Sequence, residues 1–397
     1  MAYFQFYRFG FLLALLLSLW TVAGHAQEPR YRYISLDQVV LPPGFTSFSP
    51  SAIQESGRVY GTLCDSTCSV TQLAYFKNGS LTAVAPIPPG SFTGPVNARG
   101  TVGGGVLVDP VNFIFRAALF RGGQVEIVPP QPGELFAAVM ALNDADTALV
   151  ISFSASQITY VLYSGGKAAP INFGPSITNP SFPSSLSGTC RCINNQGIIA
   201  GTEGPNRFNG ARGFRFDTRT GVATILSPYA GDPTETLAWG MVVNQRRNVL
   251  GYSFTIGITP YHERIGVWEN NGTFDTFLVE STNSSELLFN DNNLIVITAI
   301  YTPPISYIVP RPGVRLSLAD QVVNLPVGQD LLLITDLNNH GDMIGRSSTS
   351  ANFLLERLDA GSPQAFATPV VSNAPRALPS AIAVMRNRFL PQLGRLK

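Results

Sequence analysis

The amino-acid sequence predicts an all-β protein, a seven-bladed β-propeller with four antiparallel strands per blade. Three observations lead to this prediction. A hairpin motif recurs seven times, at intervals of 43 to 51 residues. Each copy is followed by two further strand patterns, so one repeat has the length and strand number of a propeller blade. Finally, the repeated region begins with one strand that has no blade of its own and ends with a repeat that lacks its fourth strand.

The hairpin motif consists of a strand end, a tight turn and a second apolar run, as in INNQGIIAG at 193–201. Asn opens the turn in six copies and can hydrogen-bond its own backbone. The last turn position holds Gly, Asp or Asn in six copies, types that tolerate positive φ, and Arg247 is the exception. Four residues later five copies carry a glycine, which in a strand marks a bulge or a close backbone approach. The copies begin at Ile53, Val96, Leu142, Ile193, Val243, Phe289 and Leu337.

The third strand of the repeat ends on an aromatic residue in five copies, and a glycine turn such as Asn78-Gly79 or Asn271-Gly272 leads into the fourth. Residues 32–40 resemble residues 315–323, the fourth strand of the sixth repeat, yet no strands precede them. The last repeat ends after three strands, near Leu358. We therefore expect residues 31–36 to join the sheet of residues 332–358 and close the ring.

The sequence divides into three parts. Residues 1–26 form an expected signal peptide, with Arg8, an apolar core over 11–20 and small residues before Ala26. Residues 27–360 form the propeller. Residues 361–397 form a Pro-containing basic tail, expected to be disordered. The alternative is a basic segment that contacts an anionic surface or acts as a sorting element. We expect a monomer that is secreted, periplasmic or on the cell surface, without a transmembrane span once the signal is removed.

The charge of the chain limits the kinds of partner it can bind, and its cysteines suggest disulfides rather than a zinc site. The net charge is +1 and 13% of residues are charged, which argues against a nucleic-acid partner. An even number of cysteines in an exported chain suggests disulfides. Cys64 and Cys68 are expected to bridge a hairpin loop, whereas Cys190 and Cys192 either form a small strained ring or stay as thiols. Neither pair has the C-x-x-C spacing of a zinc site.

The repeats resemble those of exported bacterial HAF-repeat proteins, whose units read approximately I-N-x-x-G-x-I-V-G followed by His-Ala-Phe. The Asn-x-x-Gly half matches well over residues 31–358. The His-Ala-Phe half matches in hydrophobic pattern, with Arg116, Arg212 and Arg264 where three of the histidines would stand. The resemblance implies a secreted propeller and brings no known reaction or catalytic residues.

Motifs for catalysis are missing from the sequence. There is no H-E-x-x-H, G-x-S-x-G, P-loop or Rossmann fingerprint, and outside the signal the histidines are His262 and His340. Asn143-Asp144-Ala145-Asp146 faintly resembles a calcium loop, but a turn explains the same residues. We therefore predict no catalytic residue, metal site or cofactor.

The long, irregular loops point to a binding surface, because function gathers on loops of excess length. In a propeller these loops share one rim, opposite the Asn turns. They cover residues 172–189, 202–211, 227–236 and 252–264. The candidate binding residues are Glu203, Asn206, Arg207, Asp232, Glu235, Trp239, Tyr261, His262, Glu263 and Arg264.

Three functions fit this surface. The leading hypothesis is a non-enzymatic propeller that binds a protein or glycan, with Tyr261 and Trp239 stacking and Arg207 and Arg264 contacting anions. The second is a carbohydrate-active hydrolase or lyase using two of Glu203, Asp232, Glu235 and Glu263 as its carboxylate pair. The third is a cell-surface structural protein tethered by its tail.

Overall fold

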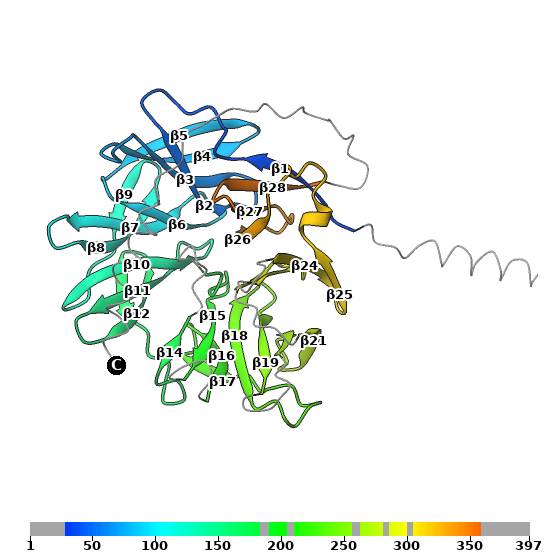
Figure 1. The fold of residues 1–397 in the computed structure, drawn as a ribbon. Helices are drawn as coiled ribbons and strands as arrows, with labels where there is room; N and C mark the ends of the chain where they lie inside the picture. Colours follow the sequence, from blue (N-terminus) through cyan, green and yellow to red (C-terminus); the bar gives the residue numbers. More distant parts are fainter. Residues whose placement is uncertain are drawn as a thin grey trace, which may run out of the picture.

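The structure, a computed structural model, describes residues 28–182, 190–204, 210–255, 263–280, 286–299 and 305–358. Seven four-stranded antiparallel sheets stand in a ring, which confirms the predicted seven-bladed β-propeller (Figure 1). The expected signal peptide 1–26 and tail 361–397 lie outside the described residues. The described part of the chain holds no helix with the length and apolarity that crossing a membrane requires.

The first six blades follow one another along the chain, and each has its strands in sequence order. Blade 1 consists of β2 (Ser47–Ile53), β3 (Val59–Cys64), β4 (Thr71–Lys77) and β5 (Ser80–Ile87). Blade 2 consists of β6 (Phe92–Val96), β7 (Val102–Asp109), β8 (Ile114–Arg121) and β9 (Gln124–Ile127). Blade 3 consists of β10 (Glu134–Leu142), β11 (Ala148–Ser154), β12 (Ile158–Ser164) and β13 (Lys167–Pro170).

The second half of the ring continues the same order. Blade 4 consists of β14 (Pro180–Ser181), β15 (Ile198–Glu203), β16 (Arg212–Asp217) and β17 (Val222–Ile225). Blade 5 consists of β18 (Leu237–Val243), β19 (Val249–Phe254), β20 (Glu263–Trp268) and β21 (Phe274–Glu280). Blade 6 consists of β22 (Glu286–Phe289), β23 (Ile295–Ala299), β24 (Ile305–Arg311) and β25 (Val314–Ser317), and the 3-10 helix η1 (Ala319–Gln321) follows it.

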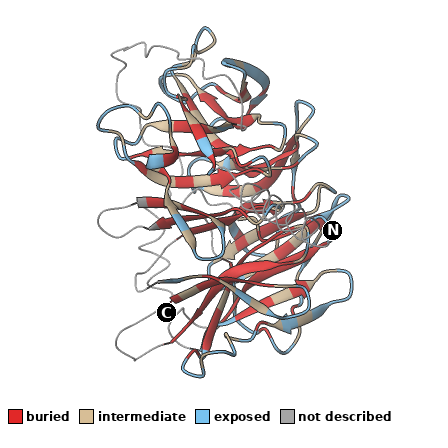
Figure 2. Cartoon of the chain, turned by 90° about the vertical axis from the view of Figure 1, so that its right-hand side faces the viewer, coloured by how far each residue is buried: buried red, intermediate tan, exposed pale blue. Residues whose placement is uncertain are grey.

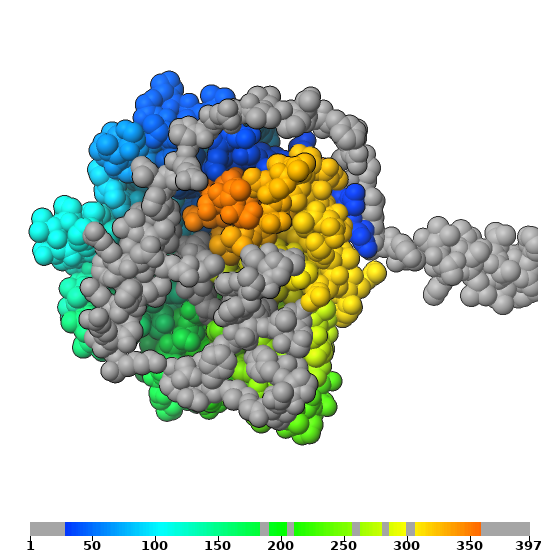
Figure 3. All heavy atoms as spheres, viewed as in Figure 1, coloured from blue at the N-terminus to red at the C-terminus, as the bar shows by residue number. Residues whose placement is uncertain are grey.

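Blade 7 joins both ends of the repeated region. It consists of β26 (Leu331–Leu337), β27 (Met343–Ser347), β28 (Asn352–Leu358) and β1 (Arg30–Ser35). Strand β1 runs antiparallel to β28, with Arg30 opposite Leu358 and Ser35 opposite Phe353, which confirms the predicted closure. In Figures 1 and 3 the blue start of the propeller therefore borders its orange end.

The core lies between neighbouring blades rather than inside a single sheet. The inner strands β15 and β19 are buried along their whole length, since both of their faces pack on another blade. The outer strands β9 and β17 remain partly exposed. Figure 2 shows this division, with buried strands inside and exposed loops at the margins.

The last position of every Asn turn has positive φ, as the sequence predicts. Gly57, Gly100, Gly197 and Gly341 share this conformation with Asp146 and Asn293. Arg247, the exception in residue type, takes φ 67° as well. Its backbone carbonyl accepts a hydrogen bond from Arg215 and its guanidinium contacts Gln196, so contacts to blade 4 hold it in this conformation.

The second glycine of the motif permits a close approach between the first and second strands. A Cβ at Gly251 would lie 1.9 Å from the carbonyl oxygen of Trp239, and one at Gly345 would lie 2.2 Å from that of Leu333. The register shifts opposite both positions, at a bulge in the first strand. This confirms the expected bulge or close approach.

The first amide of each turn links neighbouring blades into what we call the amide belt. The side-chain nitrogen of Asn194, for example, donates to the backbone carbonyl of Asn244 at 2.9 Å. Equivalent bonds run from Gln54 to Asn97, Asn97 to Asn143, Asn143 to Asn194, Asn290 to Asn338 and Asn338 to Gln54. In the described residues the seventh donor, Nδ2 of Asn244, has no acceptor. The motif's Asn therefore caps its own turn and also fastens the next blade.

The second residue of each turn makes a parallel set of bonds, which we call the turn ring. The backbone N–H of Asp144 donates to Oδ1 of Asn195 at 2.7 Å, and the N–H of Asn195 donates to Oε1 of Gln245 at 2.9 Å. The same bond recurs from Ala98, Gln245, Asp291 and Asn339, each to the side chain of the next blade. The turn ring comprises Glu55, Ala98, Asp144, Asn195, Gln245, Asp291 and Asn339.

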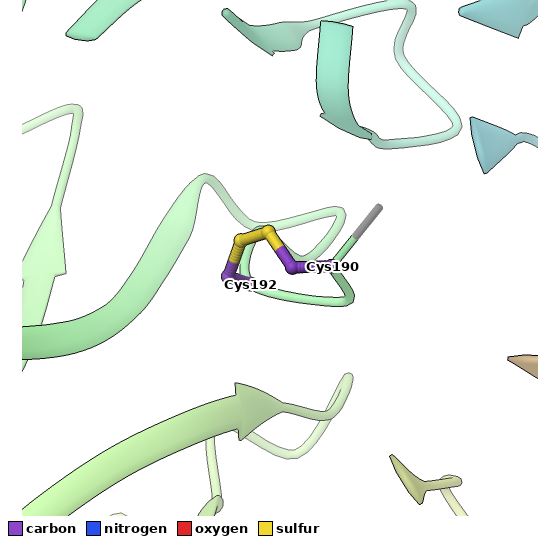
Figure 4. The surroundings of a disulfide bond; sticks show 2 residues. All are labelled: Cys190 and Cys192. Atoms are coloured by element: carbon purple, nitrogen blue, oxygen red, sulfur yellow. A yellow bond between two sulfur atoms is a disulfide. The ribbon is translucent and has the colours of Figure 1, made fainter. Parts of the chain in front are cut away.

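The two cysteine pairs differ from each other. Cys190 and Cys192 form a disulfide, which the sequence left open (Figure 4). The predicted bridge between Cys64 and Cys68 is wrong, since both are free thiols. Their loop is closed instead by Asp65, whose carboxylate accepts the N–H groups of Thr67 and Ser69. Burial, together with a hydrogen bond to Cys68, raises the pKa of Cys64 to about 12.

Candidate functional site

The two rims of the ring are chemically different. We call the rim that carries the Asn turns the Asn-turn rim. The opposite rim, the long-loop rim, carries the loops between second and third strands and the connections between blades. Of the candidate residues predicted there, Asn206, Arg207, Tyr261 and His262 lie outside the described residues.

Three of the predicted residues do come together on blade 5. The Nε of Arg264 donates to Oε1 of Glu235 at 2.8 Å, and its Nη2 lies 3.8 Å from Oδ2 of Asp232. The guanidinium also lies 4.2 Å from the ring centroid of Tyr229. The side chain of Glu235 is fully buried, so this cluster fastens the loop that precedes β18.

The other described candidates serve the packing of their blades. Glu203 is buried at the end of β15, and its carboxylate accepts hydrogen bonds from the Thr178 hydroxyl and the Asn179 N–H. Glu263 is fully buried at the start of β20. Trp239 packs against the core, with its ring 5.9 Å from that of Tyr252. Glu203 and Glu263 are therefore held inside their blades, and Trp239 is partly buried.

Blades 2 and 3 also carry exposed apolar side chains at the ends of their strands, outside the predicted site. Val111 and Phe113, in the loop between β7 and β8, are 83% and 44% exposed. The remaining members come from the ends of β7, β10 and β12. We call Val108, Val111, Phe113, Leu135 and Ile158 the blade 2–3 patch.

The blade 2–3 patch stands on a rigid base. Rings of Phe115 and Phe136, from adjacent blades, lie 5.6 Å apart, and Phe136 lies 5.7 Å from Phe153. Arg116 donates to the backbone carbonyl and to the buried carboxylate of Glu134, which ties blade 2 to blade 3. Arg116, one of three arginines at the same position of the repeat, thus forms an ion pair between blades.

The exposed loop within the patch has a fixed shape. The carboxylate of Asp109 accepts the N–H groups of Val111 and Asn112 and also the Asn112 side-chain amide. These bonds hold the pKa of Asp109 below its usual value. Phe113 takes φ 54°, a strained conformation for a bulky residue. The loop therefore presents an aromatic side chain at the surface in a conformation that costs energy.

The Asn-turn rim contains a cavity of about 270 Å³. Residues of all seven blades line it, so it lies on the axis of the ring, and every member of the turn ring is among them. In the described residues no group of three or more His, Cys, Asp and Glu side chains is placed to hold a metal ion.

Arg191 reaches across this cavity from the disulfide segment. Because β14 is only two residues long, residues 190–193 occupy the inner edge of blade 4, where Cys190 N–H donates to the Met140 carbonyl. The Nε of Arg191 donates to Oδ1 of Asp336 on blade 7 at 2.9 Å, and its Nη1 lies 3.9 Å from Oε1 of Glu55 on blade 1. The disulfide thus fixes a cation that links blade 4 to the opposite side of the ring.

The charges of these groups shift the pKa values of Arg191 and Glu55. Burial alone would lower the pKa of Arg191, but the charges of Asp336 and Glu55 outweigh burial and raise it. Burial raises the pKa of Glu55, which Arg191 and the Asn339 N–H only partly offset. None of these residues belongs to the site predicted from the sequence. The signals were a charged residue between two cysteines, and an aspartate within the apolar inner strand LLLITDL.

The raised pKa of Glu55 makes stability depend on pH. Stability from the protonated carboxyl is complete below the unfolded pKa of about 4.3 and is lost as pH rises through the higher folded value. Glu55→Gln, which places here the residue type of Gln245, removes this loss. We expect the variant to gain stability relative to the parent between pH 4 and pH 7. Urea unfolding at both pH values measures this, and an equal difference at both would contradict it.

No family model matches the chain, and no curated protein matches it significantly. Solved structures resemble it. Acylaminoacyl peptidase from Pyrococcus horikoshii gives a TM-score of 0.50 at 8% identity, over 78% of this chain and 52% of that one. The chain is a β-propeller protein.

Other propellers give weaker similarity. The β-propeller domain of the Trilobed protease from Pyrococcus furiosus gives a TM-score of 0.49 at 10% identity, over 80% of this chain and 100% of that one. TolB from Acinetobacter baumannii gives 0.39 at 11% identity, over 71% of this chain and 63% of that one. The chain thus spans about half of the peptidase and less than two thirds of TolB. At these identities the likeness concerns the fold alone.

Proposed function

We propose that this chain is an exported binding protein of the HAF-repeat type, whose long-loop rim recognises a protein partner. The blade 2–3 patch carries the proposal. Large apolar side chains exposed on neighbouring blades are a feature of protein interfaces, whose centres are enriched in aromatic residues. A protein partner would bury Val111 and Phe113 and recover the free energy of their contact with water.

The arrangement of charges supports binding rather than hydrolysis. A glycosidase needs two carboxyl groups that face the substrate across a few ångströms. Here Glu203 is bound to Thr178 and Asn179, and Glu235 is bound to Arg264. Both carboxylates are buried within their blades, and their bonds hold the loops that frame the rim.

The proposal is tested by capturing partners with the mature protein from the extracellular fraction of its source. Val111→Asp with Phe113→Asp places charges in the patch, and Asp tolerates positive φ better than Phe. We expect the double variant to lose the captured protein. The matched control is Val84→Asp with Val222→Asp, two exposed valines on outer strands of other blades. Equal capture by both double variants would refute the proposal, as would a glycan-only ligand on an array.

A further inference from the structure

Two free thiols lie together in the loop between β3 and β4, on the long-loop rim of blade 1. Cys64 is the last residue of β3 and is half-buried, whereas Cys68 is exposed. Their side chains form a hydrogen bond, which brings the two sulfur atoms face to face. In the part of the chain that the structure describes, no third His, Cys, Asp or Glu side chain completes a larger set of metal ligands around them.

The loop fixes both cysteines before any ligand arrives. The carboxylate of Asp65 accepts the N–H of Ser69 at 2.8 Å and its hydroxyl at 2.7 Å. The Cys68 N–H donates to the Asp65 carbonyl at 3.2 Å. The Cys64 carbonyl accepts the Thr46 N–H at 2.9 Å. Because both backbones are held in place, a ligand that binds the two sulfur atoms loses little free energy in ordering them.

The surroundings of Cys64 favour a bound cation. Burial, the hydrogen bond with Cys68 and the charge of Asp65 all raise the pKa of Cys64. Asp65 itself stays ionised, because hydrogen bonds from Ser69 and the loop backbone lower its pKa. Cys68 and Asp65 are the titratable groups that act on Cys64. The Cys64 sulfur therefore holds its proton firmly, and a metal ion can take the place of that proton.

We propose that Cys64 and Cys68 bind one Cu(I) ion between their sulfur atoms. Soft thiolate ligands select Cu(I), and two of them are enough for this ion, whereas a structural zinc site needs four ligands. Each thiol releases its proton as its sulfur binds the metal, so two protons leave for each ion bound and no electron is transferred. The site lies on blade 1, apart from the blade 2–3 patch, and does not depend on a protein partner.

The test supplies Cu(I) to the purified full-length protein as its coloured bicinchoninate complex, in the absence of oxygen. The loss of colour counts the ions that the protein removes from the complex. We expect one ion per chain for the parent and none for Cys64→Ser or Cys68→Ser, because each variant keeps only one of the two sulfur ligands. Ser66→Ala, which changes an exposed residue of the same loop, is the matched control and should bind as the parent does. Equal uptake by the parent and both cysteine variants, or no uptake by the parent, would overturn the proposal.

A second measurement uses the parent protein alone and so does not depend on how a variant folds. Cys64 is protonated in the free protein near neutral pH and must lose its proton to the solvent when Cu(I) binds. The affinity for Cu(I), measured by the same competition, should therefore rise at least about tenfold for each unit of pH above neutrality. An affinity that does not change with pH would contradict the proposal.

A count of free thiols separates the metal site from a disulfide at the same place. The purified protein is unfolded with denaturant and a chelator and treated with dithiodipyridine, which reacts with each free thiol. We expect two thiols per chain, those of Cys64 and Cys68, because Cys190 and Cys192 form a disulfide. If no thiol reacts, Cys64 and Cys68 are joined to each other in the isolated protein, and the proposed site does not exist.

Discussion

Deleting residues 28–36 is expected to abolish the cooperative unfolding transition. These residues supply β1, which pairs with β28 along its whole length. Tyr31 and Leu36 are fully buried and Tyr33 nearly so. Losing three such side chains removes on the order of 6–10 kcal/mol. This is comparable to the whole stability of a typical folded protein, about 5–15 kcal/mol.

The measurement is a thermal melt followed by circular dichroism. A single substitution provides a milder version, because Tyr31→Ala should cost about 3–5 kcal/mol while keeping the backbone bonds to β28. Val40→Ala is the control, since Val40 is 89% exposed and lies just beyond the strand. A deletion variant that melts cooperatively at the parent's temperature would show that β1 does not close the ring.

The amide belt is expected to contribute measurably to stability, and the chain offers a matched pair of residues to show it. Asn194→Ala removes two bonds within its own turn and the donation to Asn244. Each of the three lost bonds contributes about 1 kcal/mol, and the buried groups left unsatisfied together cost up to about 1 kcal/mol more. The free energy of unfolding should therefore fall by about 3–4 kcal/mol. Asn244→Ala removes the same two turn bonds, but no bond to the next blade.

Asn244→Ala should therefore cost about 1 kcal/mol less than Asn194→Ala. Urea unfolding of both variants without reducing agent, which keeps the Cys190–Cys192 disulfide intact, gives the two values. If the two variants are equally destabilised, the bonds between blades add nothing beyond the capping of each turn.

The repeat made most of the fold predictable. Period, turn chemistry and strand pattern agree in most copies, and the strand at 31–36 supplies the fourth strand that the last repeat lacks after 358. Even Arg247 takes the positive φ of the other turns, held by its contacts to blade 4. Local rules suffice for such features, since a blade is specified by residues close together in sequence.

The functional surfaces were harder to predict. Of the predicted binding residues, Asp232, Glu235 and Arg264 contact one another, with Glu235 buried and the other two partly exposed, but their role in binding stays a prediction. Arg191 and Asp336 form an ion pair although they lie 145 positions apart in the sequence. No local sequence pattern predicts that contact. The blade 2–3 patch could not be predicted, because its apolar residues have the pattern of ordinary buried strand residues. Only the structure shows that they are exposed.

The pairing of β1 with β28 also determines when the protein can finish folding. Arg32 and Glu356, which bond across this pair, are 324 residues apart. During synthesis the first strand is made early and must wait until residue 358 has left the ribosome. Until then the nascent chain carries an unpaired strand β1, and blade 1 lacks the neighbouring blade 7 against which it packs. Contacts this distant slow folding and prolong exposure to aggregation, so a holdase that protects the early blades should raise the yield of closed rings.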